Sequence, residues 1–201
     1  MGTPLNYSFY PDQSGVIMVI SLPSELLIYL RASPFSPHYM DFLGGRDAVC
    51  VDCPTSATGS VGGGQKFGGS TQVNVADDNT FDWEVSDSFS IEFWMKTDAG
   101  STCAGNQVIV GRDDSSTDLH WWVGCMDGGA AAFTLIDKGA DGGGLIGKTD
   151  LTNGNWHHVV AVRDSVVNEI RLYVDGVREA SNSKVYSSGF DSAVPLNIGW
   201  L

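Results

Sequence analysis

The chain has 201 residues, which is enough for one β-sandwich of ordinary size or at most two small domains. Hydrophobic residues make up 42% and the mean hydropathy is −0.03, which excludes a disordered chain and a membrane bundle. The 24 acidic and 11 basic residues give a net charge of −13. This charge disfavours nucleic acid and anionic membrane surfaces as partners, whereas cations and neutral ligands remain compatible with it.

The first apolar run covers residues 16–22 (VIMVISL) and is too short to span a bilayer. No Lys or Arg precedes the run, and Pro23 and Glu25 interrupt it, which is atypical of a cleaved signal peptide. We expect residues 16–22 and 26–30 to form a buried β-hairpin. An atypical export signal or an added leader is the alternative.

Composition changes near residue 49. Residues 1–49 contain four acids and two bases, a net charge of −2, whereas residues 50–201 contain 20 acids and nine bases, a net of −11. Residues 32–48 contain Pro and Gly at several positions and predict a linker. We therefore expect residues 1–47 to be an N-terminal extension with a possible hairpin, and residues 48–201 to be the main domain.

From residue 65 onward the apolar residues recur with period two, which is typical of half-buried strands. In the clearest run, Phe89, Ile91, Phe93 and Met95 alternate with Ser90, Glu92, Trp94 and Lys96. Further strands are expected at Val73 and Val75 and at residues 108–110, 119–123, 131–136, 156–162, 170–174 and 196–198. Gly, Asn and Asp clusters separate them, and Asp175-Gly176 has the spacing of a two-residue hairpin turn. The fold class is therefore all-β, and the regular spacing favours a sandwich.

Four segments occur in the order of a known family: FSIEFWMKT at 89–97, NGNWHHVVAVRD at 153–164, IRLYVDGVREAS at 170–181 and LNIG at 196–199. They resemble the laminin-G-like domains of the concanavalin A-like lectin/glucanase jelly-roll superfamily, over about residues 48–201, and are also similar to pentraxins. The resemblance implies a sandwich of two antiparallel sheets. It implies little about function, because lectins, adhesion modules, glycosidases and lyases share this fold.

The sequence departs from the family pattern after LNIG, where a further strand usually closes the sheet. We expect the N-terminal strands to fill that place in the same chain or in a neighbouring copy. The alternative is an open sheet edge, which would support a homo-oligomer.

The four cysteines favour disulfides over a metal site. Cys50 and Cys53 form a C-x-x-C pair, but Cys103 and Cys125 lie 22 residues apart and provide no second zinc knuckle. A redox C-x-x-C would open a helix, whereas this pair leads into a Thr- and Gly-rich segment. We expect disulfides Cys50–Cys53 and Cys103–Cys125, with zinc as the alternative. Because disulfides persist in oxidising compartments, we expect a secreted protein, extracellular or periplasmic.

Catalytic patterns are sparse. The E-x-D-x-x-E string of laminarinase-like members is absent, and the nearest carboxylate pair is Asp82 and Glu84, a weak candidate for glycoside hydrolysis. His157 and His158 fall on a scaffold strand in the resemblance, and Asp175 is a turn residue. We expect structural roles for all three.

Asp113, Asp114 and Asp118 place three carboxylates on one loop that leads into an aromatic strand. Calcium prefers oxygen ligands of this kind, and laminin-G-like domains often bind calcium at a loop on the sandwich rim. We therefore expect a possible calcium site here. A solvated acidic turn is the alternative.

His120, Trp121 and Trp122 follow this loop directly. Adjacent strand residues face opposite sides, so one indole can be core and the other should be partly exposed or lie on a concave face. An exposed indole would stack on a sugar ring beside His120, near the turns at 127–129 and 141–144. Burial of both indoles is the alternative.

Three functions remain open. A carbohydrate-binding module, assisted by calcium, is the leading hypothesis, with a glycan or polysaccharide as partner, no nucleic acid and no membrane span. A structural or adhesion module that binds a protein is the second. A small glycosidase or polysaccharide lyase is the third, and we expect a binding module rather than an enzyme.

Overall fold

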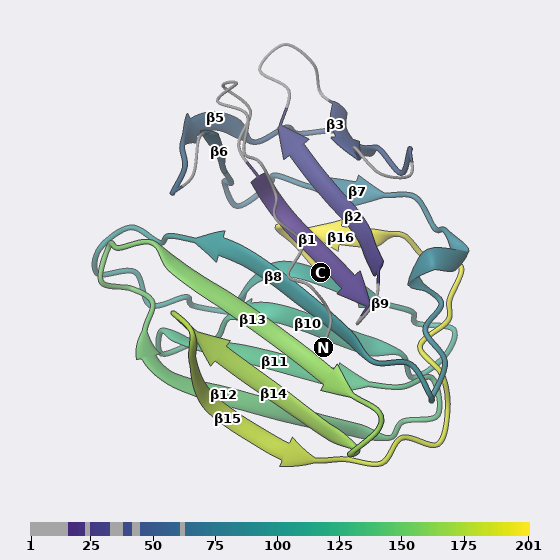
Figure 1. Ribbon diagram of the computed structural model, residues 1–201. Coiled ribbons are helices and arrows are strands. Elements are labelled where there is room, and N and C mark those ends of the chain that lie inside the picture. Colours follow the sequence, from purple (N-terminus) through teal and green to yellow (C-terminus); the bar gives the residue numbers. More distant parts are fainter. Residues whose placement is uncertain (1–15, 23–24, 33–37, 42–44, 61–62) are drawn as a thin grey trace.

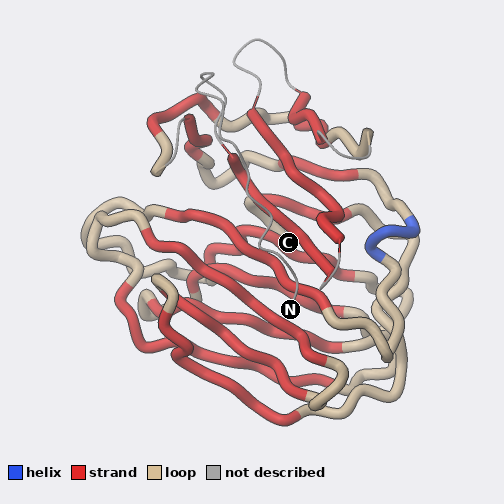
Figure 2. The backbone as a smooth tube through the Cα atoms, in the orientation of Figure 1, coloured by secondary structure: helices blue, strands red, loops and turns tan. Residues whose placement is uncertain are grey.

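The computed structural model describes residues 16–22, 25–32, 38–41, 45–60 and 63–201, with backbone alone for residues up to 40. The chain forms a β-sandwich of two layers, and its only helical turn in the described part is η1 (Asn79–Phe81), as Figure 2 shows. No helix among these residues is long and apolar enough to cross a membrane. The all-β prediction is confirmed.

The strands divide between two layers and a connecting region (Figure 1). The front layer contains β8 (Phe89–Met95), β13 (His157–Asp164), β14 (Glu169–Val174) and β15 (Val177–Ser183). The back layer contains β9 (Gln107–Asp113), β10 (His120–Cys125), β11 (Ala130–Ile136), β12 (Gly142–Asp150), β16 (Leu196–Ile198) and β7 (Val73–Val75). The connecting strands are β1 (Val16–Leu22), β2 (Glu25–Ala32), β3 (His38–Asp41) and β4 (Ala48–Cys50). A separate hairpin pairs β5 (Thr55–Thr58) with β6 (Gly63–Lys66).

Hydrogen bonds join fourteen strands into one sheet, in the order β12-β11-β10-β9-β16-β7-β4-β3-β2-β1-β8-β13-β14-β15. The sheet folds back on itself, so that its two arms become the front and back layers of a jelly roll (Figure 1). All the pairings along it are antiparallel, for example β8 with β13 and β9 with β10. The expected sandwich of antiparallel sheets is present.

The strands of the expected N-terminal hairpin pair with each other, and the burial expected for their side chains lies outside what the structure describes. β1 pairs with β2, and the other edge of β1 pairs with β8 through Val19↔Glu92 and Ile20↔Ile91. These strands therefore connect the front layer to the rest of the sheet within one chain. In the segment expected to be a linker, the described residues include β3, which pairs with both β2 and β4. A domain boundary at residue 47 stays a prediction.

The core lies between the two layers and is built by the alternation visible in the sequence. Phe89, Ile91 and Phe93 of β8 are buried, and the indole of Trp83 stacks on Phe89 with ring centroids 3.9 Å apart. Trp83 also contacts Trp121 of the back layer, with ring centroids 5.6 Å apart. Large aromatic side chains supply much of the apolar area that stabilises a sandwich of this size.

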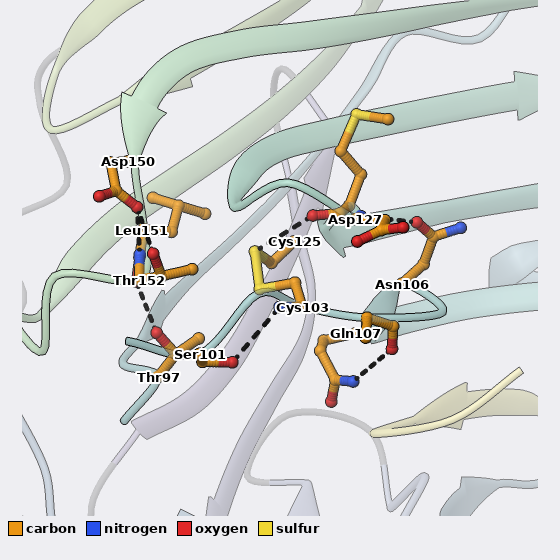
Figure 3. Close-up of a disulfide and its surroundings, with 12 residues drawn as sticks. Thr97, Ser101, Cys103, Asn106, Gln107, Cys125, Asp127, Asp150, Leu151 and Thr152 are labelled. Carbon is orange, nitrogen blue, oxygen red and sulfur yellow. Dashed lines mark hydrogen bonds between the residues drawn. A yellow bond between two sulfur atoms is a disulfide. The ribbon is translucent and has the colours of Figure 1, made fainter. Parts of the chain in front are cut away.

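Both expected disulfides are present. Cys103–Cys125 is buried and joins the segment before β9 to the last residue of β10. Figure 3 shows this disulfide between the loop at 97–107 and the turns at 127 and 150–152. Thr97 Oγ1 donates to the Leu151 carbonyl at 2.7 Å, so the same region is also connected by hydrogen bonds. Cys50–Cys53 closes a short loop at the end of β4.

Candidate functional site

The acidic loop expected to bind calcium is the hairpin between β9 and β10. Asp113 and His120 face each other across the two strands, and His120 Nδ1 lies 2.8 Å from Asp113 Oδ1. Both side chains are exposed. Asp118 is also exposed, at the tip of the hairpin.

Asp114 points in a different direction and is buried. Its Oδ1 accepts hydrogen bonds from the backbone N–H of Ser116 at 2.9 Å and from the Ser116 hydroxyl at 2.6 Å. Its Oδ2 accepts from the Ser192 hydroxyl at 2.6 Å. Hydrogen bonds from the Ser116 hydroxyl and then from Ser192 hold the pKa of Asp114 below its usual value. Asp114 therefore ties the hairpin to the loop before β16.

The carboxylates of Asp113, Asp114 and Asp118 thus lie in different surroundings. Among the residues that the structure describes, no group of three or more His, Cys, Asp or Glu side chains is arranged to hold a metal ion. The calcium site stays a prediction. The turn at 127–129 follows Cys125, at the far end of β10 from His120, so it does not meet the acidic loop as we expected.

Trp121 and Trp122 point to opposite sides of β10, as the alternation predicts. Trp121 is 0% exposed and belongs to the core between the layers. Trp122 is 8% exposed and lies on the outer face of the back layer, outside that core. Partial exposure of the outward indole, one of its two expected positions, is therefore not found. Both are covered in this structure.

Asp82, half of the weak catalytic pair, has a structural role. Its Oδ1 accepts from Arg112 Nη1 at 3.3 Å and from the Ser192 N–H at 3.1 Å. Arg112 is fully buried on β9 and also donates to the carbonyls of Phe81 and Val194. The guanidinium therefore joins the segment around η1 to the loop before β16. Glu84, the other half of the pair, is exposed.

His157 and Asp175 form a structural pair at the end of the front layer, with His157 buried and Asp175 exposed. His157 is buried, with Nδ1 2.8 Å from Asp175 Oδ2 and Nε2 3.1 Å from Asn153 Oδ1. Asp175 and Gly176 have φ values of 50° and 80°, the left-handed conformation that the expected two-residue turn requires. Asp175 Oδ1 also accepts from the His158 N–H at 2.9 Å, which fixes the backbone of the next residue.

An exposed cluster that we did not expect lies on the outer face of the front layer, formed by Glu92, Trp94 and His158. Trp94 of β8 pairs in register with His158 of β13, and their rings stack with centroids 5.1 Å apart and planes at 29°. His158 Nε2 lies 3.5 Å from Glu92 Oε2. Trp94 is 42% exposed and is the only one of the six tryptophans classed as exposed.

The sequence did contain a signal for this cluster. The alternation in β8 places Trp94 in the outward set with Ser90, Glu92 and Lys96, opposite the buried set. A tryptophan among polar outward residues indicates a function more strongly than one adjacent to a second tryptophan. The surroundings of the adjacent pair Trp121 and Trp122 bury both rings.

Comparisons with known proteins agree with this fold. Residues 67–201 match a family described as the concanavalin A-like lectin/glucanases superfamily. The non-toxic nonhemagglutinin type A of Clostridium botulinum is 24% identical over 134 residues, which are 64% of this chain and 11% of that protein. The chain therefore spans about a tenth of the length of the curated relatives it matches.

Similar solved structures include three binding domains, each about twice as long as the part that this chain covers. The binding domain of Paraclostridial Mosquitocidal Protein 1 has a TM-score of 0.72 and 15% identity, over 86% of this chain and 43% of that one. The botulinum neurotoxin serotype G binding domain gives 0.62 and 16%, over 86% and 42%. The serotype D ligand-binding domain in complex with N-acetylneuraminic acid gives 0.52 and 14%, over 91% and 42%.

These identities are low, so the structural similarity shows the fold alone. The family match is broader, because it covers two thirds of the residues and includes all the strands whose motifs carry the resemblance. The chain belongs to the concanavalin A-like lectin/glucanases superfamily, as a laminin G-like jelly roll.

Proposed function

We propose that this chain is a carbohydrate-binding module and that Glu92, Trp94 and His158 form its glycan platform. The observation that carries the proposal is the exposed indole of Trp94, which lies on a flat, strand-built surface beside two side chains that can form hydrogen bonds. Binding sites commonly combine an apolar ring surface with a few placed polar groups.

The chemistry of the three residues is complementary to that of a sugar. The face of an indole can stack on the C–H groups of a pyranose ring, while the Glu92 carboxylate accepts hydrogen bonds from ring hydroxyls. His158 supports one side of the indole and can also exchange hydrogen bonds with a hydroxyl. Because β8 and β13 are paired along their whole length, the platform is preorganised and little side-chain entropy is lost on binding.

The comparisons support this proposal without specifying the ligand. The superfamily is named for lectins and glucanases, and the similar solved proteins are described as binding domains. One of them was solved with a bound sugar, N-acetylneuraminic acid. Secretion is part of the same proposal, because both disulfides would be stable in an oxidising compartment.

A glycan array followed by titration of the best ligand tests the proposal. Trp94→Ala should weaken binding at least about tenfold, while Trp94→Phe should retain part of the affinity because it keeps an aromatic ring. Val177→Ser, at an exposed apolar position of β15, is the matched control and should bind as the wild type does. Wild-type affinity in the Trp94→Ala variant would refute the platform.

A protein partner is a second candidate, favoured by the turn between β13 and β14. Val166 is 87% exposed, and the N–H groups of Val166 and Val167 both donate to Asp164 Oδ1, so the turn presents apolar side chains in a fixed conformation. Cell binding that survives enzymatic removal of surface glycans, and that is lost in a Val166→Ser/Val167→Ser variant, would select this candidate. Loss of binding on glycan removal would reject it.

A further inference from the structure

A second row of residues with the chemistry of a ligand site crosses the outer face of the back layer. Its members pair in register across four neighbouring strands, β10, β9, β16 and β7. In strand order they are Trp122, Gly111, Asn197 and Asn74. Their immediate neighbours along each strand are buried in the core, so the row itself faces outward.

The row contains a buried polar group without a partner. Asn197 is only 6% exposed, and its Oδ1 accepts no hydrogen bond from any described residue. Buried amide oxygens in native proteins are nearly always paired, and this one calls for a donor that the described residues do not supply. A ligand hydroxyl would supply such a donor.

The row also contains a position that only glycine can occupy. A Cβ atom on Gly111 would lie 2.8 Å from the Trp121 carbonyl oxygen and 3.0 Å from Trp122 Cβ. Gly111 therefore has no side chain of its own between Trp122 and Asn197, and a flat ring could approach its backbone wherever no other side chain covers it. An aromatic side chain, bare backbone and amide groups thus lie next to one another across three strands.

The last residues of the chain cover this row. The Gly199 N–H donates to the Ile109 carbonyl at 2.9 Å, and Trp200 Nε1 donates to Asn74 Oδ1 at 2.9 Å. Leu201 Cδ1 would lie 3.0 Å from a Cβ on Gly111, the same distance as Trp122 Cβ. The Leu201 side chain therefore occupies the space above Gly111, although 37% of this residue is still exposed.

We propose that this row is a second carbohydrate subsite, which binds one uncharged pyranose residue when the Leu201 side chain moves away. This subsite rests on the proposed function for its class of ligand. It is a separate site, because it lies on the back layer whereas Trp94 lies on the front layer. Trp122 would stack on the ring, and the amides of Asn197 and Asn74 would exchange hydrogen bonds with hydroxyls. None of the four residues carries a charge, and the chain has a net charge of −13, so an acidic sugar would be excluded.

The experiment uses the full chain with the Trp94→Ala substitution, so that the first platform does not contribute. The probes are methyl α-mannoside, methyl β-galactoside and N-acetylglucosamine, followed by saturation-transfer NMR and tryptophan emission. N-acetylneuraminic acid is the acidic control and should not bind. Adding Leu201→Gly should strengthen binding of at least one neutral probe about tenfold, because the conformation in which the Leu201 side chain occupies the space above Gly111 no longer competes with the ligand.

Asn197→Leu provides the matched test of the amide. It keeps the approximate shape of the side chain and removes the unpaired oxygen, so the melting temperature should not fall, whereas binding in the Leu201→Gly background should be lost. If Leu201→Gly leaves the affinity unchanged, or if Asn197→Leu binds as its parent does, the subsite is refuted. Binding by the wild type alone would refute the subsite and leave the Trp94 platform standing. Binding that is absent from the wild type, in which Trp94 is intact, and that appears only when Leu201→Gly is added would support the subsite and refute the Trp94 platform.

Discussion

The outer faces of the two layers differ in how far their outward tryptophan is exposed. The strands that carry the two tryptophans do not show this difference. Each face carries an outward tryptophan with a partner on the next strand, Trp94 opposite His158 on the front layer and Trp122 opposite Gly111 on the back layer. Trp94 is exposed in the cluster that it forms with Glu92 and His158. Trp122 is buried, and the Leu201 side chain lies over Gly111 beside it. Whether an outward tryptophan is available to a ligand therefore depends on distant segments that cross the strand.

The largest expected difference between the faces is in stability. Trp122→Ala removes a buried indole and should lower the free energy of unfolding by about 3–5 kcal/mol, whereas Trp94→Ala should change it by less than about 1 kcal/mol. Urea denaturation of both variants measures the two values. Equal losses would mean that the two tryptophans are buried to the same extent in solution.

The rim where the two faces meet gives the next largest effect. β12 and β15 are the end strands of the sheet, and Glu179 of β15 accepts hydrogen bonds from the N–H groups of Lys148 at 2.7 Å and Thr149 at 3.2 Å on β12. The Thr149 hydroxyl donates to the same carboxylate. The register shift after Leu172 leaves Glu179 as the extra residue of a bulge, which directs it toward β12.

Glu179→Ala should therefore lower stability by about 1–2 kcal/mol and uncover part of the β12 edge. Hydrogen exchange should accelerate at Lys148 and Thr149, and sedimentation should detect self-association. Glu179→Gln keeps acceptor oxygens and should fall between this variant and the wild type. Unchanged exchange at both amides would show that the carboxylate does not protect this edge.

A smaller effect concerns pH and is specific to the back layer. The pKa of Asp114 lies below the usual 3.8 because the Ser116 hydroxyl, then Ser192, donate to the carboxylate. A lowered folded-state pKa stabilises the protein above the unfolded value, and this contribution disappears as pH falls through the folded value. Asp114→Asn should cost about 1 kcal/mol at neutral pH and should show less acid sensitivity below about pH 4. Parallel pH curves for the two proteins would contradict this role.

The smallest expected effect is that of calcium. Asp114 accepts three hydrogen bonds, and Asp113 lies against His120, so a calcium ion bound by either of them together with Asp118 would have to compete with these contacts. We expect calcium to raise the melting temperature by less than about 2 °C, since stabilisation scales with the excess of ligand over Kd. A larger rise that disappears in Asp113→Ala/Asp118→Ala would establish the calcium site expected from the sequence.

The sequence by itself determined the all-β class and the strands with clear alternation, but not β12, which begins at Gly142 where the sequence predicted a turn. Alternation of Phe89, Ile91 and Phe93 with polar residues specifies one buried face, because successive side chains on a strand point to opposite sides. Asp175-Gly176 specifies its turn through the backbone conformation that it permits. The opposite orientation of Trp121 and Trp122 follows from the same alternation. These are local properties, and each is encoded within a few residues.

Only the tertiary structure decided which outward residues are accessible. Asp82 and Asp114 are residues of the kind that occur in functional sites, but their carboxylates accept structural hydrogen bonds. Asp82 accepts from Arg112 and Asp114 accepts from Ser192, each donor at least 30 residues away in sequence. Leu201 likewise lies over Gly111, the partner of Trp122 on the next strand, although no local pattern relates Leu201 to that strand. A strand pattern fixes the direction of a side chain, but its exposure is set by whatever part of the chain the fold brings over it. For that reason the alternation located Trp94 on the surface, and the fold alone showed that it stays uncovered.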